Sequence, residues 1–113
     1  MNIKFKRSDI WSMNNRIEIA QDFANKINSK YIKQIILYGS VARHEDTKYS
    51  DIDILIISNH RDKIWPVLRN QITNIGLNQD ELISAHVISE EMFNKTKNYS
   101  FLTNVMKEGL IIG

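Results

Sequence analysis

The sequence of 113 residues contains no cysteine and a single proline. The absence of cysteine excludes disulfide bonds, catalysis by a thiol and zinc sites built from thiolates. The longest apolar runs have four residues, at 35–38 and 54–57, whereas a membrane-spanning helix needs about 20. The first residues do not lead into an apolar segment, so neither a signal peptide nor a membrane span is predicted. We therefore expect a cytoplasmic location.

The sequence also lacks an excess of charge of either sign. Fifteen Lys and Arg against thirteen Asp and Glu give a net charge of +2, which is too small and too evenly spread to predict a stable nucleic-acid partner. Residues 1–8 contain Lys4, Lys6 and Arg7 and are expected to form a mobile start. The composition is typical of a globular protein, and the length predicts one domain over residues 1–113.

Apolar residues at steps of three and four predict two long helices. The first covers residues 9–29 and has Ser8 or Asp9 as its N-cap. The second covers residues 61–75 and ends at Gly76, which suits the position just after a helix. Both helices therefore have one apolar face that must be buried against another element.

Short apolar runs predict strands at 35–38, 51–57 and 82–88, with a further edge strand at 110–112. After the third strand, Ser89 is expected to cap a short helix that reaches about Thr96. Ser100 is expected to cap another short helix, which ends at Gly109. We find neither internal repeats nor a linker.

Two aspartates, Asp51 and Asp53, alternate with isoleucines in the strand predicted at 51–57. Side chains two residues apart in a strand point to the same face, roughly 6 to 7 Å apart along the chain. Both carboxylates can therefore ligate one divalent cation, and oxygen ligands of this kind suit Mg²⁺ or Mn²⁺. The alternative interpretation is a solvated strand face that binds no metal.

Gly39 and Ser40 follow the strand at 35–38. Glycine lets the backbone approach a ligand closely, and a short helix that begins at Ser40 would direct free N–H groups toward an anion such as phosphate. Arg43 is a candidate for a further phosphate contact, with an exposed arginine as the alternative. A phosphate site beside a metal site is typical of phosphoryl or nucleotidyl transfer.

One segment resembles the signature of the DNA polymerase β-like nucleotidyltransferase superfamily, and more narrowly its minimal nucleotidyltransferase (MNT) domains: Gly39-Ser40-Val41-Ala42-Arg43 followed by Ser50-Asp51-Ile52-Asp53. The resemblance covers residues 15–112. It implies the nucleotidyltransferase fold, a small α/β (α+β) domain with a mixed β-sheet and helices packed on one side. In the family the Gly-Ser pair binds the triphosphate and the two aspartates bind Mg²⁺, which carries over to Gly39, Ser40, Asp51 and Asp53.

Two positions depart from the family pattern. His44 stands where the family usually has glycine. The third carboxylate of active members, which ligates the metal and acts as a base toward the acceptor, falls at Ser84 in this chain. Asp80, Glu81 and His86 are the candidates to replace it, because all three lie in or just before the third strand.

The resemblance implies an enzyme that binds a nucleoside triphosphate with Mg²⁺ or Mn²⁺ and transfers a nucleoside monophosphate to an acceptor. Asp51 and Asp53 would be catalytic and bind the metal, while Gly39, Ser40 and Arg43 would bind the nucleotide. The acceptor site is expected on another subunit or on a partner such as a HEPN (higher eukaryote and prokaryote nucleotide-binding) protein. The alternative is a degenerate nucleotide-binding domain that acts as the antitoxin of a HEPN-type toxin.

Overall fold

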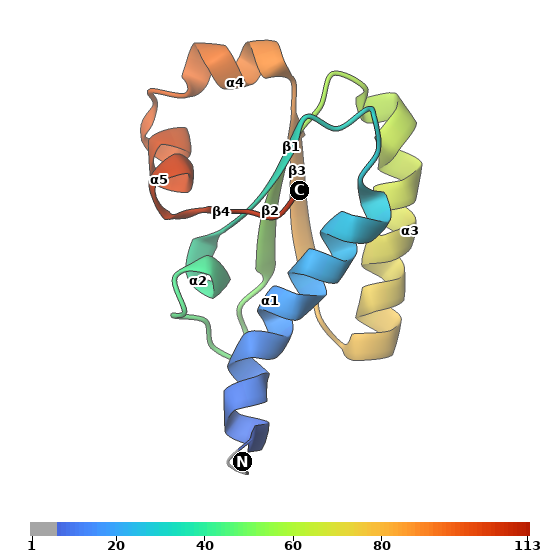
Figure 1. Cartoon of the computed structure of the whole chain (residues 1–113), viewed down its shortest axis with the longest axis vertical. Coiled ribbons are helices and arrows are strands. Elements are labelled where there is room, and N and C mark those ends of the chain that lie inside the picture. The colour runs from blue at the N-terminus through green and yellow to red at the C-terminus, as the bar shows by residue number, and fades with distance from the viewer. Residues whose placement is uncertain (1–6) are drawn as a thin grey trace.

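The computed structural model describes residues 7–113, with side chains described from residue 15 onward. Over these residues the chain forms five helices and four strands in the order α1, β1, α2, β2, α3, β3, α4, α5, β4 (Figure 1). Residues 1–6, most of the segment expected to be mobile, lie outside the described residues. None of the described helices is both long enough and apolar enough to cross a bilayer.

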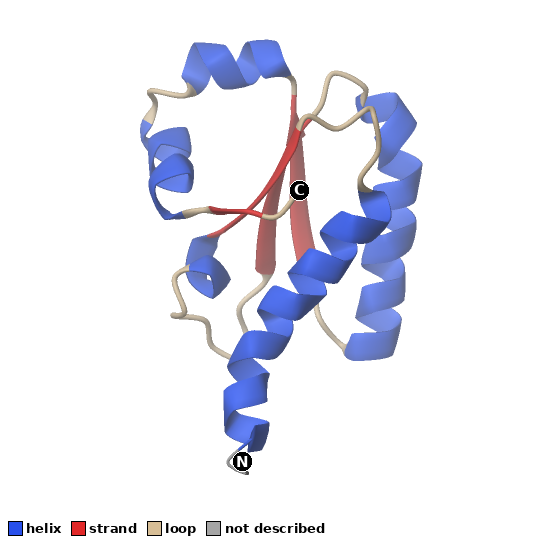
Figure 2. Cartoon of the chain, viewed as in Figure 1, coloured by secondary structure: helices blue, strands red, loops and turns tan. Residues whose placement is uncertain are grey.

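The strands form one mixed sheet in the order β3-β2-β1-β4 (Figure 2). Strand β1 (Gln34–Tyr38) pairs antiparallel with β2 (Ile52–Ile57) and with β4 (Leu110–Ile111). Strand β3 (Ile83–Ile88) runs parallel to β2. The predicted fold class and the edge strand near the C-terminus are therefore confirmed.

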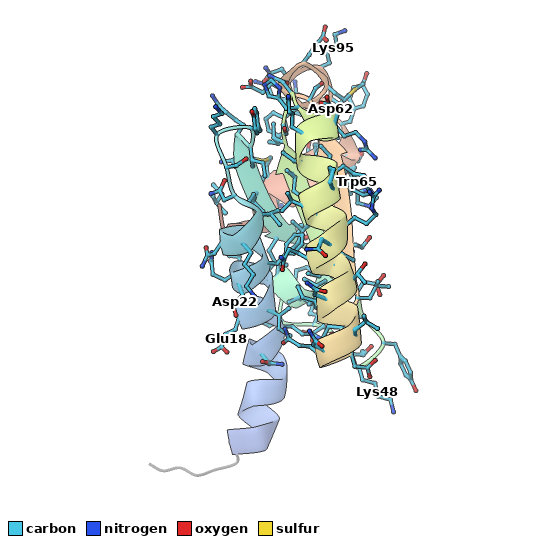
Figure 3. The ribbon with its side chains drawn as sticks, turned by 90° about the vertical axis from the view of Figure 1, so that its right-hand side faces the viewer. Glu18, Asp22, Lys48, Asp62, Trp65 and Lys95 are labelled. Carbon is cyan, nitrogen blue, oxygen red and sulfur yellow. The ribbon has the colours of Figure 1, made fainter. Side chains whose placement is uncertain are left out.

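Two long helices, α1 (Arg7–Ile27) and α3 (Arg61–Gln79), lie side by side over one face of the sheet (Figure 3). Glu18 and Asp22 lie on the outer side of α1 in this view. The inner sides of both helices pack on β1 and β2 through buried apolar residues: Ile19, Ala20, Phe23, Ala24, Ile64, Leu68 and Ile75 on Ile35, Leu37, Ile52, Ile54 and Ile56. This burial is the main source of stability on this face.

The opposite face of the sheet is apolar as well, and α5 (Ser100–Glu108) packs on it. The second core cluster consists of residues from β1, β2 and α5: Ile36, Leu55, Ile57, Leu102 and Val105. The helices predicted on one side of the sheet correspond to α1 and α3. Helix α5 covers the other side, where the sequence predicts no helix. A central strand that is apolar on both faces needs cover on both.

The two long helices differ from their predicted limits. Helix α1 begins at Arg7, so Ser8 and Asp9 lie inside the helix instead of capping it. Helix α3 continues through Gly76, which was predicted to end it. A glycine inside a helix costs about 1 kcal/mol, and the burial of Ile75 on the core offsets this. The helix ends at Asp80, which takes the left-handed conformation with φ 55°.

The two short helices agree more closely with the sequence. Ser89 caps α4 (Glu90–Thr96) as predicted, because its Oγ accepts a hydrogen bond from the Met92 backbone N–H at 3.0 Å. Helix α5 ends at Gly109 as predicted, but its N-cap position is Tyr99 and not Ser100. The Tyr99 side chain makes no capping hydrogen bond.

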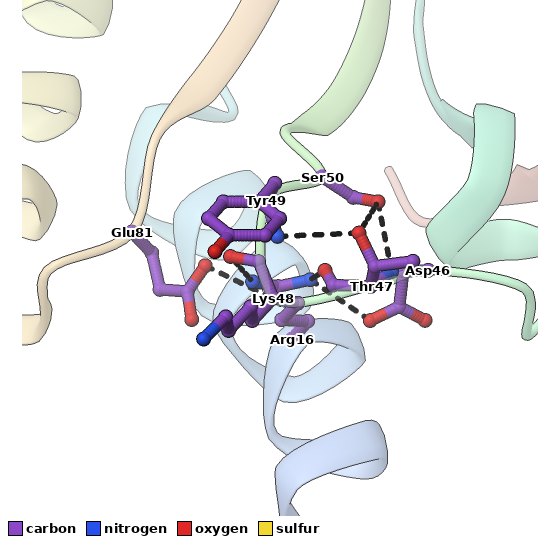
Figure 4. A network of polar contacts seen from close by, with 7 residues as sticks. All are labelled: Arg16, Asp46, Thr47, Lys48, Tyr49, Ser50 and Glu81. Atoms are coloured by element: carbon purple, nitrogen blue, oxygen red, sulfur yellow. Dashed lines mark hydrogen bonds and ion pairs between the residues drawn. The ribbon is translucent and has the colours of Figure 1, made fainter.

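Arg16 of α1 is a buried charged residue, with 7% of its surface exposed. Its Nη1 donates to Asp46 Oδ2 at 2.9 Å, and its Nε donates to Glu81 Oε1 at 3.0 Å (Figure 4). The backbone carbonyls of Thr47 and Lys48 also accept from its guanidinium. One side chain thus ties α1 to the loop that enters β2 and to the residues that enter β3.

We expect Arg16→Ala to lower the free energy of unfolding by about 3 to 5 kcal/mol, because it leaves Asp46 and Glu81, whose side chains are 7% and 17% exposed, without their partner. Arg69→Ala is the matched control, since Arg69 is exposed on α3 and its loss should change the stability by less than about 0.5 kcal/mol. Urea denaturation followed by circular dichroism measures both variants. Equal unfolding midpoints for Arg16→Ala and the wild type would contradict a structural role for this network.

Candidate active site

The end of β1 and the start of β2 bring Gly39 against Asp53. The antiparallel register pairs Tyr38 with Asp53, and the chain then turns at Gly39 with φ 78°. A Cβ at Gly39 would overlap the Asp53 Oδ2 atom. Both the positive φ and this close approach require glycine. The missing side chain lets the Asp53 carboxylate pack directly against the turn.

The turn leads directly into α2 (Gly39–Ala42), a helix of four residues. It begins at Gly39, one residue earlier than the start at Ser40 that the sequence predicts. Val41 and Ala42 are buried and fix this short helix on the core. The N–H groups of its first turn have no acceptor inside the helix, so the backbone donors of Gly39 and Ser40 are not used within α2.

Strand β2 directs Asp53 to the face of the sheet that carries α5. Ile52 and Ile54 point into the core under α1 and α3, and Asp53 lies between them on the alternate side. Asp51 is exposed just before the strand. Burial raises the pKa of the Asp53 carboxyl, and the negative charge of Asp51 raises it further. The nearby His86 and Arg43 side chains lower it in part.

The two aspartates fit a divalent cation. Their mutual repulsion, which contributes to the raised pKa of Asp53, would be relieved by a positive ion between them. Mg²⁺ is commonly held by one or two carboxylates and completes its shell with water and phosphate oxygens. Among the side chains that the structure describes, those of residues 15–113, no group of three or more His, Cys, Asp or Glu could hold a metal. The pair could therefore hold the ion together with a phosphate ligand.

Ser84 lies directly beside Asp53 in the sheet. The parallel register pairs Ser84 with Asp53 and His86 with Leu55, so both side chains of β3 share the face of Asp53. Glu81 is bound by Arg16 and Asp80 ends α3 before the strand begins. Of the three candidates for the missing carboxylate, His86 is the one on the face of Asp53.

Arg43 is engaged by two acidic side chains. Its Nε donates to Glu45 Oε1 at 3.0 Å and its Nη1 donates to Glu108 Oε1 at 3.2 Å. The hydrogen bond with Glu45 contributes most to the raised pKa of the Arg43 guanidinium, followed by that with Glu108. A contact with phosphate, as the sequence predicts, would require Arg43 to exchange one of these partners.

His44 adopts a backbone conformation that glycine favours, with φ 60°. The sequence departs from the family pattern here, because the family usually has glycine at this position. The left-handed conformation costs a side-chain-bearing residue about 1 to 2 kcal/mol. The turn after Arg43 therefore keeps the geometry expected of glycine at a modest cost in stability.

A pocket of about 280 Å³ opens beside Gly39. It is lined by residues from the end of β1, from α2 and its C-cap, and from α5: Tyr38, Gly39, Arg43, Phe101, Asn104, Val105 and Glu108. A larger and more open hollow of about 550 Å³ lies at the start of α3, lined by Asn59, Arg61, Asp62, Trp65 and Pro66. It follows the other end of β2, away from Asp53, so the smaller pocket is the one that belongs to the site.

The nucleotidyltransferase domain family matches residues 18–110, and the chain therefore belongs to this family. A protein of Methanocaldococcus jannaschii, provisionally named a protein adenylyltransferase, is 42% identical over 101 residues, which span 87% of this chain and 98% of that one. The crystal structure of a Sulfolobus solfataricus protein named as a nucleotidyltransferase aligns with a TM-score of 0.54 at 16% identity, covering 97% of this chain and 90% of that one. At this identity the likeness concerns the fold.

A lower similarity, with a TM-score of 0.48 at 17% identity, relates the chain to one chain of a toxin–antitoxin complex crystallised with AMP-PNP. The alignment covers 89% of this chain and 72% of that one. The nucleotide and the partner are properties of that complex.

The raised pKa of Asp53 gives the stability a defined pH dependence. The folded protein holds this proton more tightly than the unfolded chain, so the stabilising contribution is present at low pH and is lost as the pH rises through the folded pKa. We expect Asp53→Asn to raise the free energy of unfolding at pH 7, by less than about 1 kcal/mol because water screens a partly exposed carboxylate. The gain should shrink as the pH falls below the ordinary value of 3.8.

Thermal unfolding of the wild type and of Asp53→Asn between pH 3 and pH 7, roughly the range over which an aspartate titrates, measures this effect. Asp22→Asn is the control, since Asp22 is exposed on α1. A lower stability of Asp53→Asn at pH 7, or an equal gain in both variants, would contradict the assignment.

Proposed function

We propose that this nucleotidyltransferase uses Mg²⁺ to transfer AMP from ATP to a hydroxyl group of a protein. The observation that carries the proposal is the close approach of the Asp53 carboxylate to Gly39, the residue at which α2 begins. The relative of 42% identity, named provisionally for transfer of an adenylyl group to protein, supports the choice of nucleotide and acceptor.

Each side chain of the site has a role in this proposal. Asp51 and Asp53 would hold Mg²⁺, with Mn²⁺ as a substitute, and the ion would supply positive charge against the triphosphate. The backbone N–H groups of Gly39 and Ser40 would bind phosphate oxygens, because a helix start favours anions. Arg43 would add a phosphate contact once it leaves Glu45 or Glu108.

The reaction transfers one group and releases another. The acceptor oxygen forms a bond to the α-phosphorus of ATP, the bond from that phosphorus to the bridging oxygen breaks, and pyrophosphate leaves. The proton of the acceptor hydroxyl needs a base. We assign this role to His86, because it shares the face of Asp53 and an imidazole is suited to proton exchange near neutral pH.

Ser84 favours a second candidate function. A serine beside Asp53 cannot ligate a metal as a carboxylate does, which would reduce transfer and leave nucleotide binding in place. Such a degenerate domain would act as the inhibitory partner of a HEPN-type toxin. If the domain instead transfers AMP, as in the first candidate, a HEPN-type protein would be the acceptor.

The first candidate predicts the fate of a labelled phosphate. When the purified protein is added to an extract of the source cells with Mg²⁺, the labelling of protein that depends on this addition should come from ATP labelled at the α-phosphate and not from ATP labelled at the γ-phosphate. Asp53→Asn should lower the transfer by about 100-fold or more, the usual effect of removing a group that stabilises developing charge. Asp22→Asn should transfer at the rate of the wild type.

Transfer of the γ-label, or full transfer of the α-label by Asp53→Asn, would contradict adenylyl transfer at this site. Ser84→Asp separates the two candidates. If the wild type binds ATP without labelling protein and Ser84→Asp gains labelling, the second candidate is correct.

A further inference from the structure

The pocket beside Gly39 adjoins the part of the site that holds Asp53. Gly39 connects the two, because it lies against the Asp53 carboxylate and also lines the pocket. Burial raises the pKa of the Tyr38 hydroxyl, and the charge of Asp53 raises it further, which places Tyr38 within electrostatic reach of that carboxylate. A molecule that reaches Gly39 can therefore extend into the pocket.

Two aromatic rings border this pocket. The ring of Tyr38 meets that of Phe101 edge to face, with 5.5 Å between the centroids and 87° between the planes. Tyr38 packs against the second core cluster, whereas Phe101 has 53% of its surface exposed. An exposed aromatic surface at the border of a pocket suits a planar ligand, and stacking of one nucleobase on such a ring contributes about 1 to 3 kcal/mol.

Helix α5 adds polar groups to the same pocket. Phe101, Asn104 and Glu108 are three and four residues apart and so lie on one face of the helix, and all three line the pocket. An asparagine amide offers a donor and an acceptor side by side. At its N6 and N7 edge adenine presents the complementary pair, whereas the N7 and O6 edge of guanine presents two acceptors and is matched by arginine or lysine.

The cationic side chain that lines the pocket is already bound to acids. Arg43 donates to Glu45 and to Glu108, so guanine would have to compete with two carboxylates for it. Adenine needs no such exchange, because it can pair with Asn104. The polar groups of the pocket therefore favour adenine.

We propose that this pocket binds the nucleobase of the triphosphate, stacked on Phe101 and hydrogen-bonded by Asn104, with adenine preferred over guanine. The proposal rests on the proposed function, because the base can lie here when the phosphates lie at Gly39 and Ser40. It extends that function by naming the residues that select the nucleotide.

The contribution of the base is separated from that of the phosphates by comparing ATP with inorganic tripolyphosphate, which has no base. Both are titrated with Mg²⁺ into the full chain and followed by calorimetry. We expect Phe101→Ala to weaken ATP binding about 5- to 150-fold, the equivalent of one lost stacking contact, and to leave tripolyphosphate binding unchanged. Tyr99→Ala is the matched control, since this aromatic residue precedes α5, is 67% exposed and does not line the pocket.

The choice of base is tested by Asn104→Asp. A carboxylate cannot donate to a ring nitrogen of adenine, but it can accept from the N–H groups of guanine. The ratio of ATP affinity to GTP affinity should therefore fall at least about 10-fold, within the range for one bidentate base contact. Asn98→Asp makes the same change of charge at an exposed residue that does not line the pocket, and should leave the ratio unchanged.

Other outcomes would overturn the proposal in distinguishable ways. Equal losses of ATP and tripolyphosphate affinity in Phe101→Ala would mean that Phe101 supports the phosphate site or the fold and not a base. Unchanged ATP affinity with slower transfer to the acceptor would assign the pocket to the acceptor. Both results leave the proposed function intact. If the wild type bound neither ATP nor tripolyphosphate, the base assignment and the proposed function would fail together.

Discussion

The close approach of Gly39 to Asp53 is the constraint on which the rest of the site depends, and the register of β1 on β2 fixes it. A shift by one residue in β2 would turn Asp53 into the core and its isoleucine neighbours toward the other face. The burial of Ile52 and Ile54 under α1 and α3 opposes that shift. Hydrophobic packing on one face of the sheet therefore holds Asp53 in place on the other face, where burial raises the pKa of its carboxyl.

Arg16 supports the same arrangement from outside the sheet. Its guanidinium binds Asp46 in the loop that enters β2 and Glu81 just before β3. The network thereby orders the loop before Asp51 and engages Glu81 away from Asp53. Ser84 lies beside Asp53, so the proposed chemistry would depend on two carboxylates in place of the family's three.

The sequence predicts the elements that are encoded locally. Alternation of aspartate and isoleucine predicts the face of Asp53, and the apolar runs predict β1 and β2 to within one residue at either end. The features it does not predict depend on distant residues. Arg16 binds partners 30 and 65 positions away, and the pocket combines β1 with α5. The sequence offers one signal for this pocket: polar and aromatic residues recur on one face of α5, next to its buried residues. At Gly76 a local helix-ending signal is outweighed by the packing of Ile75.

We propose that Asp51 and Asp53 complete a site for a nucleoside triphosphate and Mg²⁺. Calorimetric titration of ATP, with and without Mg²⁺, into the wild type and Asp53→Asn tests it most directly. We expect binding by the wild type that requires Mg²⁺ and is lost in Asp53→Asn. Binding that is indifferent to Mg²⁺ or equal in the variant would contradict it, as would the absence of binding in the wild type.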